Sequence, residues 1–150
     1  MQRLQGAPDE CAHEVLDVVP LAMRVIREQL RKHGTQLLSV PQFRTLLFIN
    51  RNKGASLSEV ADHIGLTLPS MSALVDGLVT RNFVTRRTHQ DDRRRVDLTL
   101  TERGETTLLI ATKATQDHLK EQFGRLSEAE RSTIVRSMRI LRQVFSEKSA

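Results

Sequence analysis

The run of charged residues from Asp91 to Arg95 is the part of this chain whose side chains are best suited to binding chemistry. It holds two carboxylates and three guanidinium groups. It lies between two segments with strand composition, roughly Phe83 to Thr88 and Val96 to Leu100. Arginine at the tip of a narrow hairpin suits the minor groove of duplex DNA, where the potential is most negative. The sequence therefore predicts a hairpin that binds double-stranded DNA.

A helix-turn-helix pattern precedes this hairpin and would position it. Ser56 to Glu59 forms a capping box that opens a short helix, and Gly65 makes the turn after it. Thr67 can cap a second helix, with Pro69 in its first turn. A short helix, a glycine turn and a second helix with small residues facing outward at its start are typical of this motif. Those outward residues are Thr67, Ser70, Ser72 and Ala73.

Two further helices are predicted before this motif. Apolar residues recur at helical spacing from Glu10 to Lys32. Pro20 inside this run predicts a kink or a break, and Gly34 is expected to end the helix. Pro41 opens the next helix, which is expected to stop near Asn52.

Two helices are predicted after the hairpin. Thr101 can cap a long helix that reaches about Phe123, and Ser127 to Glu130 is a capping box for the last helix. Apolar residues recur along the last helix at near-heptad spacing. The terminal helices carry more apolar surface than a small core can absorb, so we interpret them as a dimer interface. The candidate interface residues are Val15, Val19, Ile134, Met138, Leu141 and Phe145.

The composition limits the classes of function. The 23 lysines and arginines exceed the 18 acidic residues, and the net charge of +5 favours polyanionic partners. Five phenylalanines with no tryptophan or tyrosine argue against binding single-stranded nucleic acid by base stacking. The single cysteine, Cys11, excludes an intrachain disulfide and fits a reducing cytoplasm. No apolar run of membrane length and no secretory leader are evident, so a soluble cytoplasmic protein is expected.

Catalysis is not expected from this sequence. It holds no dinucleotide-binding or phosphate-binding glycine motif, no zinc-protease motif and no nucleophile elbow. Cys11, His13 and Glu14 are the nearest approach to a metal site, but the motif is too short to predict one. We therefore expect no enzyme activity, no cofactor and no metal.

These segments resemble, in order, the multiple antibiotic resistance regulator (MarR) family of bacterial transcription factors. The resemblance lies in Pro41-Gln42-Phe43, Leu68 to Leu78, Val84-Thr85-Arg86, Asp92-Arg93-Arg94 and Leu100-Thr101-Glu102-Arg103-Gly104. It implies a mainly α fold with a small β-wing, a winged helix-turn-helix over 41–104 and dimerisation helices over 10–33 and 105–147. It also implies a homodimer that acts as a ligand-responsive repressor on a pseudo-palindromic operator.

The resemblance also implies roles for single residues. Arg94 would enter the minor groove, and Arg93 or Arg95 would reach the flanking phosphates, with a solvated charge run as the plainer alternative. Asp92 would hold the Arg94 guanidinium in place, although a polar turn residue explains it equally well. Adjacent Arg86 and Arg87 face opposite ways on a strand, so only one is expected to contact phosphate. The full candidate DNA-binding set is Thr67, Pro69, Ser70, Ser72, Ala73, Arg86, Arg93, Arg94 and Arg95.

Many family members bind small aromatic or anionic effectors between the dimerisation helices and the winged domain. The corresponding candidates are Met23, Arg27, Phe43, Leu47 and His63, for which core packing is the plainer explanation. Some relatives sense peroxide through an N-terminal cysteine supported by tyrosines, which this chain lacks. For Cys11 an intersubunit disulfide and an inert thiol both stay open.

One alternative function also stays open, a winged protein-interaction module that has lost operator binding. Its best support is the neutral outward face of the second helix of the motif, since hydroxyl groups discriminate poorly between bases. The three arginines at the hairpin tip argue against it. Steep salt dependence of binding would favour DNA.

Overall fold

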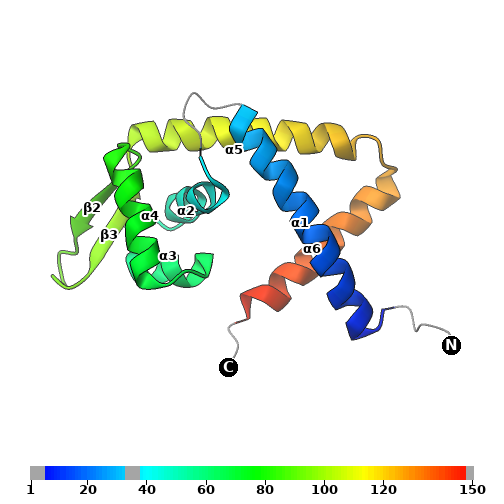
Figure 1. The fold of residues 1–150 in the computed structure, drawn as a ribbon, viewed down its shortest axis with the longest axis horizontal. Coiled ribbons are helices and arrows are strands. Elements are labelled where there is room, and N and C mark those ends of the chain that lie inside the picture. Colours follow the sequence, from blue (N-terminus) through cyan, green and yellow to red (C-terminus); the bar gives the residue numbers. More distant parts are fainter. Residues whose placement is uncertain (1–5, 33–37, 148–150) are drawn as a thin grey trace. The chain divides into compact units, whose positions relative to one another are not determined.

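The computed structural model describes residues 6–32 and 38–147. The chain separates into two compact units, Met1–Thr115 and Gln116–Ala150, and one long helix passes through the boundary between them. The described elements are α1 (Pro8–Lys32), α2 (Val40–Arg51), β1 (Ala55–Ser56), α3 (Leu57–Ile64), α4 (Leu68–Thr80), β2 (Val84–Thr88), β3 (Val96–Leu100), α5 (Glu102–Phe123) and α6 (Glu128–Ser146) (Figure 1).

The sheet of the first unit has the strand order β1-β3-β2, with both pairings antiparallel. Strands β2 and β3 extend as a narrow hairpin beside α4 (Figure 1). The expected mainly α fold with a small β-wing is therefore confirmed. Strand β1 was not predicted, because two residues are too few to show an alternating pattern. It matters nonetheless, because Ser56 pairs with Asp97 of β3 and so joins the wing to the start of α3.

Pro20 was expected to cause a kink or a break; helix α1 continues through it, so the break does not occur. Proline removes one N–H donor, which leaves the carbonyl of Leu16 without its helical partner. Both residues are exposed, so water can bond that carbonyl at little cost. The expected stop at Gly34 lies outside the described residues.

The predicted helix starts are confirmed by side-chain caps. Ser39, Ser56, Thr67 and Ser127 each accept a hydrogen bond from the backbone N–H three residues later. Gly65 ends α3 in the left-handed conformation that glycine adopts without strain, with a φ of 81°. These caps fix where α3 ends and α4 begins, and so fix the angle of the helix-turn-helix.

The core of the first unit lies under the helix-turn-helix and the sheet. Met71, Val75 and Leu78 form the buried stripe of α4. They belong to one apolar cluster with Phe83 at the start of the wing and Leu98 of β3. Both elements that would face DNA are therefore held by a common core.

The base of the wing is closed by residues of the motif Leu100 to Gly104. The Thr101 hydroxyl accepts from the Gly104 N–H at 2.9 Å, which caps α5, and donates to the Asn82 carbonyl at 2.6 Å. The backbone N–H of Thr101 also donates to the Phe83 carbonyl. Helix α5 thus starts directly against the beginning of β2. Gly104 is buried there because its backbone lies against that of Phe83.

The second unit is different, because no residue of α6 is buried. Large apolar side chains of this helix are exposed, among them Val135, Ile140 and Val144. In the described part of the chain, no helix is both long enough and apolar enough to span a membrane.

We expect Gly104→Ala to destabilise the first unit by about 1–3 kcal/mol, the usual cost of overpacking. A Cβ at this position would lie 2.9 Å from the Phe83 carbonyl carbon and still closer to its oxygen, and backbone cannot move aside like a side chain. Urea denaturation followed by circular dichroism measures the change.

Gly77→Ala in α4 is the matched control, because a Cβ there meets nothing within 4 Å. Alanine should stabilise this helix by about 0.5–1 kcal/mol. Equal effects of the two substitutions would contradict the close approach at Gly104.

Candidate nucleic-acid interface

The first turn of α4 presents hydroxyl groups and backbone N–H groups at the surface. The Thr67 hydroxyl accepts from the Ser70 N–H at 3.3 Å and donates to the Ser70 hydroxyl oxygen at 3.0 Å. Thr67 is therefore engaged in capping, whereas the proton of the Ser70 hydroxyl is left to point elsewhere. Of this pair, Ser70 is the better donor to a phosphate or a base edge.

The remaining candidates on this helix lie at the surface, as expected for its outward face. Pro69 and Ala73 are exposed, and Ser72 is half-buried. Leu68 is also exposed, at 49%, although the sequence placed no role on it. The face is small and uncharged, so it can approach a groove closely but offers few specific hydrogen bonds.

The tip of the wing is a closed turn. The His89 N–H donates to the Arg95 carbonyl at 2.9 Å, and the Arg95 N–H donates to the Asp92 carbonyl at 3.0 Å. The Asp92 carboxylate accepts from the backbone N–H of Arg94 at 2.9 Å. It does not hold the Arg94 guanidinium, so that expectation is wrong. Asp92 instead stabilises the turn, as a short acidic side chain does in an Asx-turn.

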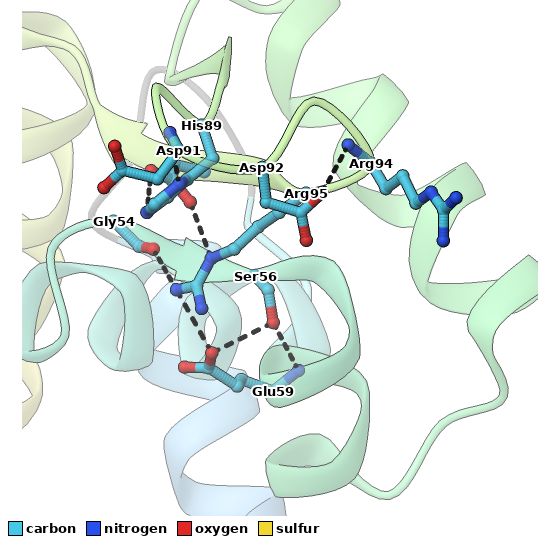
Figure 2. A network of polar contacts seen from close by, with 9 residues as sticks. Gly54, Ser56, Glu59, His89, Asp91, Asp92, Arg94 and Arg95 are labelled. Carbon is cyan, nitrogen blue, oxygen red and sulfur yellow. Dashed lines mark hydrogen bonds and ion pairs between the residues drawn. The ribbon is translucent and has the colours of Figure 1, made fainter.

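Arg95 lies elsewhere than expected, because its guanidinium points back into the protein (Figure 2). It donates to the Asp97 carboxylate at 2.9 Å and to the Gly54 carbonyl at 3.1 Å, and it lies 3.3 Å from the Glu59 carboxylate. The hydrogen bond to Asp97 raises the pKa of Arg95. Contact of Arg95 with phosphate stays a prediction, and it would compete with these three acceptors.

Arg86 and Arg87 face opposite ways, as the strand geometry predicted. Arg86 pairs with Asp76 of α4 at 2.5 Å and donates to the Ser72 carbonyl at 3.4 Å. Arg87 is exposed and forms no ion pair with any described residue. Arg86 was the candidate for phosphate contact, but the geometry makes Arg87 the better one. The two arginines differ only in the face of the strand on which their side chains lie. Which face each one takes follows from the strand register, because successive side chains alternate.

Arg93 and Arg94 are exposed at the tip, and neither side chain is paired within the described structure. Figure 2 shows the Arg94 side chain pointing away from the network that surrounds Arg95. The wing therefore directs two of its arginines, Arg86 and Arg95, onto acidic groups of the protein. The others are left for an external anion.

The candidate effector residues are not alike in the structure. Phe43 is a core residue, and Met23 and Leu47 pack against the core. Arg27 is exposed. The His63 ring stacks on the Phe48 ring, with their centres 4.4 Å apart. Effector binding by this set stays a prediction, and core packing accounts for three of its members.

The remaining candidates lie on the terminal helices. Cys11 is exposed on α1, and His13 lies 3.3 Å from Asp17, one turn further along the helix. The described residues hold no cluster of three or more metal-binding side chains. Among the predicted interface residues, Val19, Met138 and Phe145 are exposed, and the other three, Val15, Ile134 and Leu141, are half-buried.

Residues 38–95 match the sequence model of the MarR family. This segment holds the helix-turn-helix and most of the wing. Over this segment the chain is a MarR-family winged helix-turn-helix. It is 28% identical over 104 residues to YfiV of Bacillus subtilis, an uncharacterised HTH-type transcriptional regulator. The match covers 69% of this chain and 65% of that protein.

Solved structures share the fold of this chain. RV1404 from Mycobacterium tuberculosis is similar at a TM-score of 0.81 and 22% identity, over 98% of this chain and 99% of that one. Streptococcus pneumoniae FabT, solved in complex with DNA, is similar at a TM-score of 0.78 and 17% identity, over 94% and 99%. At these identities the likeness establishes the winged helix-turn-helix fold.

The environment of His63 predicts a pH dependence of stability for this protein. Burial against Phe48 lowers the pKa of His63 from 6.5, and the charges of Arg44 and Arg51 add to this effect. Because folding favours the neutral ring, the contribution of His63 is complete above pH 6.5 and is lost as the pH falls through its lower folded value.

We expect the urea midpoint to fall less between about pH 7.5 and pH 5 in His63→Gln than in the wild type. His118→Gln, which removes a histidine of α5 without an ion pair in the described structure, is the control and should keep the wild-type drop. Equal drops in the wild type and both variants would contradict a lowered pKa of His63.

Proposed function

We propose that this chain is a sequence-specific transcriptional regulator that binds double-stranded DNA. The observation that carries the proposal is the exposure of Arg93 and Arg94 at the wing tip, beside a helix-turn-helix whose own face is uncharged. A domain that docked onto a protein would have no evident use for two unpaired guanidinium groups on a thin projection. Its partner being chromosomal DNA, the protein would act in the cytoplasm.

In this proposal α4 lies in the major groove and the wing reaches the adjacent minor groove. The start of α4 contributes backbone N–H groups and the Ser70 hydroxyl to phosphate, and Ala73 offers a methyl contact for thymine. Arg94 enters the minor groove, while Arg93 and Arg87 contact flanking phosphates. Because α4 offers few direct contacts, much of the specificity would come from groove width and DNA shape.

We propose further that the regulator is a homodimer. The exposed apolar side chains of α6, among them Met138 at 51% and Phe145 at 67%, support a partner of the same kind. Val15 and Val19 of α1 would contribute to the same assembly. A two-fold dimer requires a pseudo-palindromic operator with half-sites about one helical turn, roughly 34–36 Å, apart.

Repression that responds to an effector completes the proposal. A small aromatic or anionic molecule that prefers a dimer with misplaced wings would lower operator affinity by its differential affinity for the two shapes. The candidates with polar or adaptable side chains are Met23, which packs against the core, and the exposed Arg27 and His63. Effector binding by these residues is independent of DNA binding and can fail separately.

We expect Arg94→Ala to weaken operator binding by about 1–3 kcal/mol, the scale of a good groove contact. Fluorescence anisotropy with a duplex from upstream of the protein's own gene, titrated with salt, measures it. Arg125→Ala removes the same charge between α5 and α6 and should change affinity little. If both variants bind like the wild type, Arg94 does not lie in the minor groove.

The dimer proposal is tested by Met138→Glu combined with Leu141→Glu. Burying these like charges at a helix interface should give monomers that no longer bind the operator. Ser137→Glu with Gln143→Glu adds the same charge at exposed polar positions of α6 and should leave the dimer intact. Sedimentation velocity reads the outcome, and a fully dimeric Met138/Leu141 variant would exclude this interface.

A further inference from the structure

The Arg95 guanidinium joins the wing to the segment 54–59, which lies far from it in the sequence. It bonds Asp97 on β3, the Gly54 carbonyl before β1, and the Glu59 carboxylate on α3 (Figure 2). The backbone of Arg95 meanwhile closes the wing tip through His89 and Asp92. One residue therefore connects the turn that carries Arg94 to the first helix of the helix-turn-helix.

Glu59 is the partner that links Arg95 to the start of α3. Its carboxylate accepts from the Ser56 hydroxyl at 3.1 Å, while the Ser56 oxygen accepts from the Glu59 N–H at 3.2 Å. In a complete capping box the carboxylate would bond the backbone N–H of Ser56, as Glu130 does with Ser127 at the start of α6. Glu59 instead presents the same oxygen to Ser56 and to Arg95, so it caps α3 and holds the wing together.

The geometry of these contacts would set the distance between the wing and α4, the helix proposed to enter the major groove. Ser56 is paired with Asp97 across β1 and β3, and Asp97 in turn accepts from Arg95. Arg95 also contacts Glu59, and Glu59 contacts Ser56. Ser56, Asp97, Arg95 and Glu59 therefore form a closed ring of backbone and side-chain contacts. Helix α4 packs on α3 through the common core, so a tip fixed to α3 is also fixed relative to α4.

We propose that Glu59 and Arg95 are positioning residues for DNA recognition. They hold the wing tip so that Arg94 and α4 reach adjacent grooves together, and Glu59 does this without touching DNA. The inference rests on the proposed function, since positioning has meaning only if the domain binds an operator. It assigns a role in affinity to an acidic residue that simple electrostatics would count against DNA binding.

The sign of the effect of Glu59→Gln separates positioning from charge. The substitution raises the net charge by one, so electrostatics alone predicts equal or tighter binding to any duplex. The loss of positioning predicts weaker binding to the operator only. Asp62→Asn is the matched control, because it makes the same charge change on the same helix at an exposed residue without an ion pair in the described structure.

The experiment compares two duplexes, one obtained by in vitro selection with the wild-type protein and one of random sequence. We expect Glu59→Gln to bind the selected duplex about three-fold more weakly, the scale of a partly exposed ion pair, and the random duplex as well as the wild type does. The Glu59 and Arg95 side chains are 50% and 38% exposed, which is why the expected loss is modest. Asp62→Asn should bind both duplexes as tightly as the wild type, or more tightly.

Arg95→Lys tests the other side of the contact at constant charge. One ammonium group cannot reach three acceptors in the geometry of the planar guanidinium, so operator affinity should again fall selectively. If both residues act through one contact, Glu59→Gln should cause less further loss in the Arg95→Lys background than in the wild type.

Hydrogen exchange of the backbone amides at 89–95 provides a readout that does not depend on DNA. Faster exchange in Glu59→Gln but not in Asp62→Asn, together with the selective loss of affinity, supports the proposal. Unchanged exchange overturns the contact itself, and faster exchange with unchanged operator affinity overturns its positioning role. If selection returns no preferred duplex for the wild type, the proposed function fails, and the positioning role fails with it even where exchange shows the contact to exist.

Discussion

A two-stranded hairpin is barely stable by itself in water, and this constraint governs the arrangement of the whole winged domain. To act as a rigid finger, the wing must be fixed by contacts outside its own ladder of hydrogen bonds. The structure provides such contacts at both ends. At the base, Thr101 bonds Asn82, and Gly104 lets α5 start against the Phe83 backbone. Near the tip, Arg95 bonds Asp97, Gly54 and Glu59. Between them, Arg86 pairs with Asp76 of α4.

The same contacts divide the basic residues of the wing into two groups. A guanidinium that already bonds a carboxylate gains little from a phosphate, because it would exchange one anionic partner for another. Arg86 and Arg95 belong to this first group. Arg93 and Arg94 remain solvated, so their full charge is available to an external polyanion. The wing thus uses arginine for two purposes, internal fixation and external binding, and only the partners of each side chain distinguish them.

Much of the fold followed from the sequence because its signals are local. Capping residues, the turn glycine Gly65 and the small outward residues at the start of α4 predicted the helix-turn-helix, and the composition of the strands predicted the wing. Strand β1 and the half-complete capping box at Ser56 were not predictable, because both depend on a partner distant in the chain. The internal contacts of Arg95 were missed for the same reason, because Gly54 and Glu59 are distant from it in the sequence. The expectation for Asp92 failed differently, because its carboxylate accepts from the backbone N–H of Arg94 and not from the guanidinium.

The terminal helices raise a different physical question, that of where their apolar surface goes. Helix α6 has no buried residue within the chain, and side chains such as Ile140, Val144 and Phe145 are exposed. Leaving a row of large apolar groups in water forgoes about 25 cal/mol for each Å² that a partner could cover. If a second copy covers them, folding of the terminal helices and dimerisation become one equilibrium, and stability then depends on protein concentration. Operator binding would be linked to the same equilibrium, because two wings at a fixed spacing exist only in the dimer.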